Sequence, residues 1–119
     1  MGVEAMNKYR VGREDEPDLA FTGKVLANVD NHEISGDRQN CWDEFTVYET
    51  EDGLFVAQIE YHSRWQDDFG TSRAKVFEDI NDITGYFGFV RLAKELYKDE
   101  DLVTRGLTYE VSPRFAIGA

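Results

Sequence analysis

The stretch from Trp42 to His62, WDEFTVYETEDGLFVAQIEYH, constrains the fold more than any other part of the chain. Apolar and polar residues alternate on both sides of the tripeptide EDG, which is the pattern of two β-strands joined by a tight turn. Gly53 suits the positive φ that a three-residue hairpin loop requires. We therefore predict a β-hairpin whose turn is Glu51, Asp52 and Gly53.

The length of this turn decides which side chains share a face of the hairpin. With a three-residue loop, Thr50 lies opposite Leu54, and one face carries Phe45, Val47, Phe55, Ala57, Ile59 and Tyr61. The other face carries Glu44, Thr46, Tyr48, Val56, Gln58, Glu60 and His62. A two-residue DG turn exchanges the faces of the first strand. We prefer the three-residue loop because it buries Phe45 and Val47.

Further strands are expected on both sides of the hairpin. Residues 19–31 alternate and predict a first strand, with one apolar face formed by Leu19, Phe21, Val25, Ala27 and Val29. Gly23 marks a bulge or a close backbone approach in this strand. Residues 73–78 predict a short strand that directs Ala74 and Val76 to the core. Residues 107–111 predict a last strand.

A helix is predicted over residues 80–98, with Asp79 as its N-cap. Its apolar residues sweep an arc of about 220° on a helical wheel, whereas packing on one sheet needs a stripe of about 100°. Gly85 and Gly88 each cost up to about 1 kcal/mol in a helix interior, which indicates close backbone contact. The excess apolar surface is covered either by the chain's own ends, through Phe115 and Ile117, or by a dimer or partner interface.

These elements predict an α+β fold, an antiparallel β-meander of four to five strands with one main α-helix packed on one face. The 119 residues suffice for one domain with an ordinary core. We expect residues 19–119 to form that single domain and residues 1–18, which are polar and lack a sustained period, to form a flexible acidic N-terminal arm.

Composition limits the partners. The chain has 24 acidic and 13 basic residues, a net charge of −11, so direct binding of nucleic acid or an anionic membrane is disfavoured and a basic protein surface is the natural partner. A single cysteine, Cys41, excludes an intrachain disulfide. No run of 18 apolar residues and no secretory signal is present, which predicts a cytoplasmic protein.

Residues with catalytic chemistry are few. His32 and His62 are the only histidines, and neither belongs to a recognised metal-ligand spacing. Asp30 and Glu33 flank His32, but a solvated loop explains that segment better. Cys41 has no catalytic signature around it. We therefore predict a protein that is not an enzyme, with no cofactor and no metal.

The hairpin itself is acidic throughout and contains no lysine or arginine. In the predicted register Glu44 lies opposite Glu60, which is an unfavourable pair. Either Arg64, Arg73 and Lys75 neutralise this face from within the chain, or it is a docking face for a basic partner. We favour docking. The predicted partner-binding residues are Glu44, Tyr48, Glu49, Glu51, Asp52 and Glu60, with Trp65, Asp67 and Asp68 from the following loop.

The order FTGKVLANV, WDEFTVYETEDGLFV, SRWQ and GYFGFVRLAKELY, over roughly residues 20–97, resembles small bacterial proteins carried on plasmids and integrated elements. The similarity lies in structural residues and transfers no catalytic position. In size and acidity the chain also resembles anti-CRISPR and antirestriction inhibitors. This likeness implies an inhibitor that blocks the nucleic-acid site of a basic CRISPR or restriction effector.

Two other functions remain open at this point. One is a structural or regulatory homodimer formed through helix 80–98. The other is a small enzyme or ligand binder that uses His32, His62 or Cys41.

Overall fold

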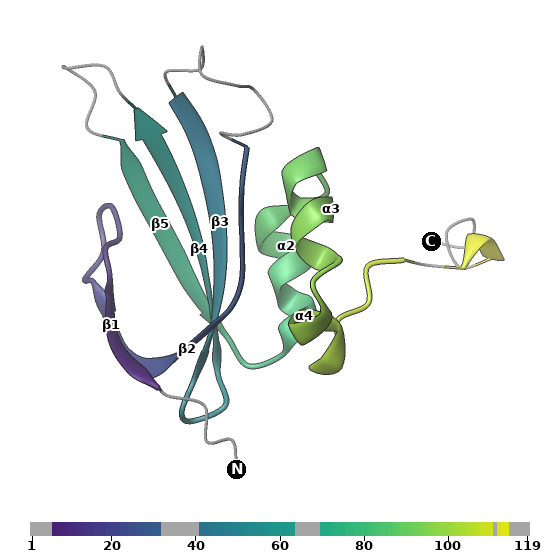
Figure 1. Ribbon diagram of the computed structural model, residues 1–119, viewed down its shortest axis with the longest axis horizontal. Helices are drawn as coiled ribbons and strands as arrows, with labels where there is room; N and C mark the ends of the chain where they lie inside the picture. Colours follow the sequence, from purple (N-terminus) through teal and green to yellow (C-terminus); the bar gives the residue numbers. More distant parts are fainter. Residues whose placement is uncertain (1–5, 32–40, 64–69, 111, 115–119) are drawn as a thin grey trace.

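The protein is built on one antiparallel sheet (Figure 1). The computed structural model describes residues 6–31, 41–63, 70–110 and 112–114. The five strands β1 to β5 follow one another in chain order across the sheet. They are β1 (Asn7–Val11), β2 (Leu19–Asp30), β3 (Cys41–Thr50), β4 (Phe55–Ser63) and β5 (Thr71–Phe77). The predicted α+β meander is confirmed.

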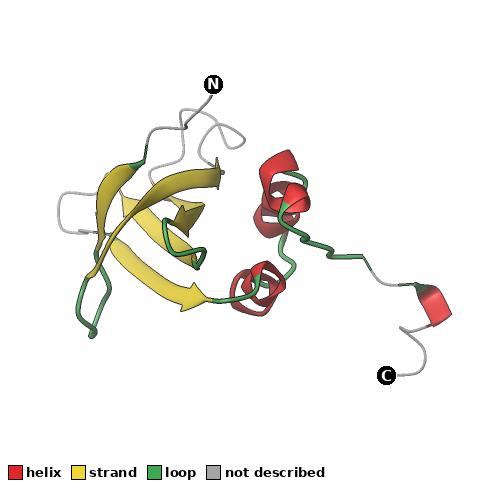
Figure 2. Cartoon of the chain, turned by 90° about the horizontal axis from the view of Figure 1, so that it is seen from below, coloured by secondary structure: helices red, strands yellow, loops and turns green. Residues whose placement is uncertain are grey.

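Short helices cover one side of this sheet, and the sheet curls away from them into a half-barrel (Figure 2). They are η1 (Ile80–Asp82), α2 (Ile83–Phe87), α3 (Arg91–Tyr97) and α4 (Glu100–Thr104). We call the sheet face that packs against them the helix face, and the opposite face, around which the sheet curls, the inner face. Successive side chains of a strand point to alternate faces, so each strand contributes to both.

The β3–β4 hairpin has the predicted register. Thr50 donates its backbone N–H to Leu54 at 2.8 Å, and Gly53 has a φ of 81°. Phe45 pairs with Ile59 and Val47 with Ala57 on the helix face, where they belong to the main core. The three-residue turn is therefore confirmed.

The strand β1 lies within the segment that the sequence predicts to be an arm, so that prediction is wrong for residues 7–11. These residues pair with β2, from Asn7 opposite Gly23 to Val11 opposite Leu19. The prediction of an arm did not take account of a short alternation in this segment, in which Tyr9 and Val11 point to the inner face. Val11 is only 2% exposed, and the ring of Tyr9 lies 4.9 Å from that of Tyr48.

The strand β2 changes faces at an irregularity between Val25 and Ala27. Phe21 packs on the inner face and Ala27 on the helix face, so the single apolar face predicted for this strand is wrong. The extra residue, Leu26, is buried in the main core. The predicted close approach at Gly23 is confirmed, since an added Cβ would lie 2.2 Å from the carbonyl oxygen of Glu49.

The long helix predicted over 80–98 is interrupted. Asp79 caps its start by accepting a hydrogen bond from the N–H of Asn81, as predicted. The helix then ends at Gly88, whose φ of 73° is unavailable to a continuing α-helix, and a new helix begins at Arg91. The apolar arc of about 220° was calculated for one continuous helix. It therefore does not describe the apolar surface of the separate helices α2 and α3. An added Cβ at Gly85 or Gly88 meets no atom within 4 Å, so the predicted close backbone contact is also wrong.

Each helical piece buries its own residues in the main core, among them Ile83, Phe87, Leu92, Leu96, Tyr97 and Leu102. The segment 107–110 is not the predicted strand. Asn81 holds it instead, because its side chain accepts from the N–H of Thr108 at 2.8 Å and donates to the carbonyl of Gly106 at 3.0 Å. In β5, Ala74 is buried as predicted, although on the inner face, whereas Val76 is 39% exposed.

Candidate functional site

The carboxylates of the acidic hairpin occupy three different environments. Glu44 and Glu60 pair directly and point to the inner face, whereas Glu49 pairs with Phe55 on the helix face. Glu51 and Asp52 are exposed at the turn. Trp65, Asp67 and Asp68 lie outside the described residues. The predicted docking face is therefore not one continuous surface.

Glu49 is neutralised within the chain. Its two carboxylate oxygens accept hydrogen bonds from Nη2 and Nε of Arg105 at 2.9 and 3.2 Å, and Lys24 lies 3.9 Å away. The hydrogen bonds from Arg105 hold the pKa of Glu49 below its ordinary value. Arg105 follows α4, far from β3 in the sequence, and no local pattern indicated this pair. Glu49 thus fastens α4 to the sheet.

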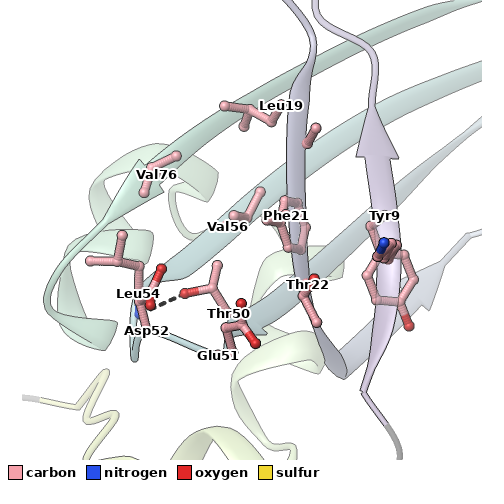
Figure 3. A pocket seen from close by; sticks show the side chains of 12 residues that line it. Tyr9, Leu19, Phe21, Thr22, Thr50, Glu51, Asp52, Leu54, Val56 and Val76 are labelled. Atoms are coloured by element: carbon pink, nitrogen blue, oxygen red, sulfur yellow. Dashed lines mark hydrogen bonds between the residues drawn. The ribbon is translucent and has the colours of Figure 1, made fainter.

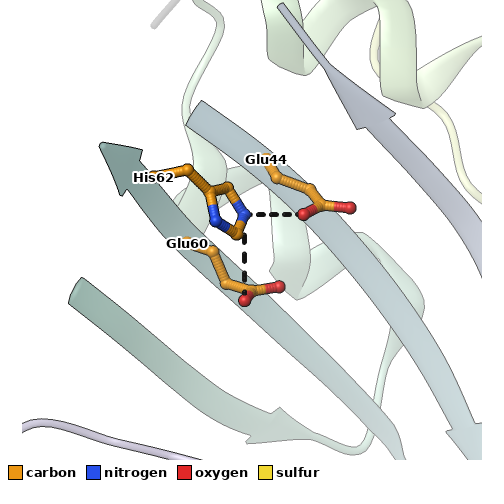
Figure 4. Close-up of side chains that lie close together, drawn as sticks. All are labelled: Glu44, Glu60 and His62. Carbon is orange, nitrogen blue, oxygen red and sulfur yellow. Dashed lines mark hydrogen bonds and ion pairs between the residues drawn. The ribbon is translucent and has the colours of Figure 1, made fainter. Parts of the chain in front are cut away.

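Glu44 and Glu60 form the unfavourable pair that the register predicted, and Arg73 and Lys75 do not relieve it. Both point to the helix face, opposite Ile59 and Ala57. Arg64, the third cation considered, lies outside the described residues. His62 is the neighbour of the two carboxylates (Figure 4). Its Nε2 lies 2.8 Å from Oε1 of Glu44 and 3.9 Å from Oε2 of Glu60.

The surroundings of Glu44 and Glu60 leave negative charge concentrated on the inner face. Asn28 donates to the second oxygen of Glu44 at 2.7 Å. Burial, and then the charge of Glu44, raise the pKa of Glu60. The indole of Trp42 stacks on the imidazole of His62, with ring centroids 5.2 Å apart.

Tyr48 is part of a hydrogen-bonded row on the inner face. Its hydroxyl donates to Gln58 Oε1 at 2.9 Å, Gln58 Nε2 donates to Ser72 Oγ at 3.1 Å, and Ser72 Oγ donates to the carbonyl of Gly12 at 2.7 Å. Burial raises the pKa of Tyr48 to about 12. The row links β3 through β5 to the β1–β2 turn, so Tyr48 stabilises the curl and is not a free anchor for a partner.

Two hollows lie at the inner side of the sheet. One, of about 400 Å³, lies between the β1–β2 turn and the adjoining ends of β4 and β5; Arg13, Asp18, Glu60 and His62 are among its lining residues. The other, of about 550 Å³, adjoins the β3–β4 turn (Figure 3). Its lining is largely apolar and includes Tyr9, Leu19, Phe21, Leu54, Val56 and Val76.

Cys41 and His62 do not form a nucleophile–base pair across the hairpin. Cys41 pairs with Ser63, whereas His62 pairs with Trp42. Because neighbouring residues of a strand point to opposite faces, the thiol and the imidazole lie on different sides of the sheet.

Several exposed acids lie at the end of the molecule that carries the β3–β4 turn, and a second group, of Glu14, Asp15, Glu16 and Asp18, lies in the β1–β2 turn. The β5–η1 linker, with η1 directly after it, and α4 lie at the same end as the β3–β4 turn (Figure 1). We call the exposed carboxylates of the β3–β4 turn, the β5–η1 linker, η1 and α4 the acidic end; they are Glu51, Asp52, Glu78, Asp79, Asp82, Glu100 and Asp101. Within the described ranges, none of them forms a salt bridge.

Comparison of the chain with protein-family models, with curated proteins and with solved structures gives no match. Among the described residues, no helix has the length and apolar character needed to cross a bilayer. Residue roles in this chain therefore follow from its own contacts and charges.

The cluster of Glu44, Glu60 and His62 was not predicted, because the chain has only two histidines and neither belongs to a known ligand spacing. The signal was present in the predicted register, where Glu44 faces Glu60 and His62 follows on the same face. The contacts that Asn28 and Trp42 make with this cluster could be found only from the structure. The contact of Asn28 depends on the irregularity in β2.

Proposed function

We propose that this protein is a non-enzymatic binding protein that docks its acidic end onto a basic protein surface. The observation that carries the proposal is the group of exposed carboxylates at the acidic end, none of which forms a salt bridge to a described cation. With a net charge of −11, the chain attracts basic surfaces and repels phosphate.

The most suitable partner is a protein that handles nucleic acid. Its lysines and arginines form a groove for a phosphate backbone, and closely spaced carboxylates on a rigid turn compete for the same cations. Resemblance to plasmid-borne and integrated-element proteins supports an inhibitor of this kind, acting in the cytoplasm against a CRISPR or restriction effector. Such a protein would be an antagonist of antiviral defence.

The docking surface differs from the one that the sequence suggests. Glu49 is held by Arg105, while Glu44 and Glu60 are directed to the inner face with His62. Glu51 and Asp52 remain from the predicted set, and the linker and α4 acids join them. We infer that the ends of the elements, not the strand faces, meet the partner.

The test is a binding measurement against purified basic nucleic-acid-binding proteins, including CRISPR and restriction effectors. The double variant Glu51→Lys/Asp52→Lys should bind the cognate partner at least about tenfold more weakly, and the wild-type affinity should fall steeply with salt. Glu14→Lys/Glu16→Lys, in the β1–β2 turn, makes the same change in net charge and should retain most of the affinity.

Competition with the partner's nucleic acid completes the test. The wild-type protein should displace the nucleic acid, and the Glu51→Lys/Asp52→Lys variant should not. Equal binding by the two charge-reversal variants, or a complex that still admits nucleic acid, contradicts the proposed function.

A homodimer is the second candidate. Phe89 and Val90, at the junction of α2 and α3, are 53% and 59% exposed, and Val103 of α4 is 54% exposed. Exposed apolar side chains of this kind are suited to an interface. Light scattering that shows only monomer at high micromolar concentration would exclude it.

A further inference from the structure

The second group of acids, on the inner face, has the composition of a metal site. Glu44 supplies one ligand atom from β3, and Glu60 and His62 supply two from β4 (Figure 4). The three side chains point toward one another, and their nearest ligand atoms all lie within 4.8 Å of each other. Paired strands fix this arrangement, because Glu44 lies directly opposite Glu60 and His62 is the next residue of β4 on the same face.

The distances suit an ion of the size of Zn²⁺. Nitrogen and oxygen ligands lie about 2.0–2.2 Å from Zn²⁺, so two ligands in a tetrahedral shell are about 3.3 Å apart. The separations of His62 Nε2 from the oxygens of Glu44 and Glu60 are 2.8 and 3.9 Å, on either side of that value. Side-chain adjustments of well under 1 Å would equalise these two separations; the two carboxylate oxygens lie within 4.8 Å of each other.

Neighbouring groups hold two of the three ligands in place. Asn28 donates to the oxygen of Glu44 that does not face His62, at 2.7 Å, and thereby orients the carboxylate. Trp42 stacks on the imidazole of His62. Outer contacts that orient the ligands in this way are a regular feature of protein metal sites.

The site is also accessible, and within the described residues its carboxylates have no lysine or arginine partner. The side chains of Glu44, Glu60 and His62 are 26%, 29% and 32% exposed, so an ion can reach them from solvent. Glu60 and His62 line the hollow of about 400 Å³ beside the β1–β2 turn. No described lysine or arginine forms a salt bridge with either carboxylate.

We propose that Glu44, Glu60 and His62 bind one divalent transition-metal ion of the Zn²⁺ class, with a remaining coordination position directed to this hollow. The imidazole nitrogen favours such an ion over Mg²⁺ or Ca²⁺, which prefer oxygen ligands. The site lies at the opposite end of β3 and β4 from the Glu51–Asp52 turn. It is therefore independent of the proposed docking function.

Calorimetric titration of the chelator-treated full chain with ZnCl₂, MnCl₂ and MgCl₂ tests the proposal. We expect one strong Zn²⁺ site per chain, with affinity in the order Zn²⁺, Mn²⁺, Mg²⁺. Glu60→Gln should weaken Zn²⁺ binding at least about tenfold. Glu51→Gln, which removes the same charge at the turn, should leave the affinity within about twofold.

Glu60→Gln is suited to this test because it should fold. Removing one of two directly opposed carboxylates relieves a repulsion in the metal-free protein. Its thermal unfolding in the presence of chelator should match or exceed that of the wild type. Glu44→Gln provides a second variant with the same expected loss of Zn²⁺ affinity.

Co²⁺ gives a spectroscopic readout of the ligands. The wild type should show visible d–d absorption bands with Co²⁺, and His62→Gln should lose or shift them. Equal Zn²⁺ affinity in the wild type, Glu60→Gln and Glu44→Gln, or Mg²⁺ binding as tight as Zn²⁺ binding, would overturn the proposal, because it would show only diffuse attraction of cations to an acidic protein.

Discussion

Glu49 and Glu60 belong to the same hairpin, yet their surroundings shift their pKa values in opposite directions. Hydrogen bonds from Arg105 lower the pKa of Glu49, whereas burial and the charge of Glu44 raise that of Glu60. The difference arises because alternate residues face opposite sides of a sheet. On the helix face Glu49 is paired with Arg105, which directly follows α4. On the inner face the near neighbours of Glu60 are Glu44 and His62.

The Glu49–Arg105 pair gives the first prediction. Arg105→Ala should lower the free energy of unfolding by about 1–2 kcal/mol near neutral pH, because it leaves a largely covered carboxylate without its charged hydrogen bonds. Chemical denaturation measures this loss. Lys98→Ala removes the exposed Lys98–Glu95 pair and should change stability by less than about 0.5 kcal/mol.

The same pair makes stability depend on pH. The pKa of Glu49 is lower in the folded than in the unfolded chain, so its contribution is present above its ordinary value of 4.5 and is lost as the pH falls through the folded value. Glu49→Gln should therefore flatten the acid side of the stability profile. An unchanged profile in this variant would contradict the assigned role of the pair.

At the scale of elements, the interruption at Gly88 determines how the helical layer packs. It separates α2 from α3, so that each piece turns its own apolar residues to the sheet. The hydroxyl of Tyr97 donates to the carbonyl of Gly88, which fastens the junction to the buried face of α3.

Two glycine substitutions test this role. Gly88→Ala should destabilise the protein by about 1–2 kcal/mol, because alanine adopts a φ of 73° only with strain. Gly85→Ala is the matched control: Gly85 lies inside α2 with no atom within 4 Å of an added Cβ. It should be neutral or stabilising by up to about 1 kcal/mol. Equal effects of the two substitutions in thermal unfolding would contradict this explanation.

The elements that the sequence predicts well are those whose signals are local. Alternation around Gly53 is enough for the hairpin register, and Asp79 is enough for the start of the helical region. The bulge near Leu26 carries no comparable signal, because apolar residues on both sides of it fit a single face equally well. The helix break at Gly88 was also hidden, since glycine is compatible with a helix interior and only its φ reveals the end.

At the scale of the whole molecule, the net charge of −11 acts on a body of 49 × 38 × 32 Å. The Debye length is about 30 Å in 10 mM salt and about 8 Å at 0.15 M, so dilute salt allows repulsion across most of the protein. Local pairs such as Glu49–Arg105 leave this net charge unchanged, because it already counts both signs, and the acidic end carries seven of the exposed carboxylates. The candidate site was predictable as an acidic hairpin with Glu44 opposite Glu60, but the neutralisation of Glu49 depends on Arg105, which only the structure places beside it.

Ionic strength therefore gives a further prediction. Raising NaCl from 10 to 150 mM, with chelator present, should raise the midpoint of thermal unfolding by a few degrees, since about 1 kcal/mol corresponds to about 4–8 °C in a domain of this size. The Glu51→Lys/Asp52→Lys variant should show a smaller increase. A midpoint that falls with salt would mean that surface ion pairs outweigh the repulsion.

The hairpin carboxylates fall into two groups: Glu49 is paired with Arg105, whereas Glu44 and Glu60 lie close together beside His62. This division can be measured directly. Carboxyl ¹³C chemical shifts followed by NMR from low to neutral pH, in chelator-treated protein, report the titration of Glu49 and Glu60 separately. Glu49 should titrate below the ordinary glutamate value of 4.5 and Glu60 above it, and Arg105→Ala should move only Glu49 upward. Coincident titration of the two carboxyls, or a shift of Glu60 in Arg105→Ala, would contradict the separate surroundings assigned to the two faces of the hairpin.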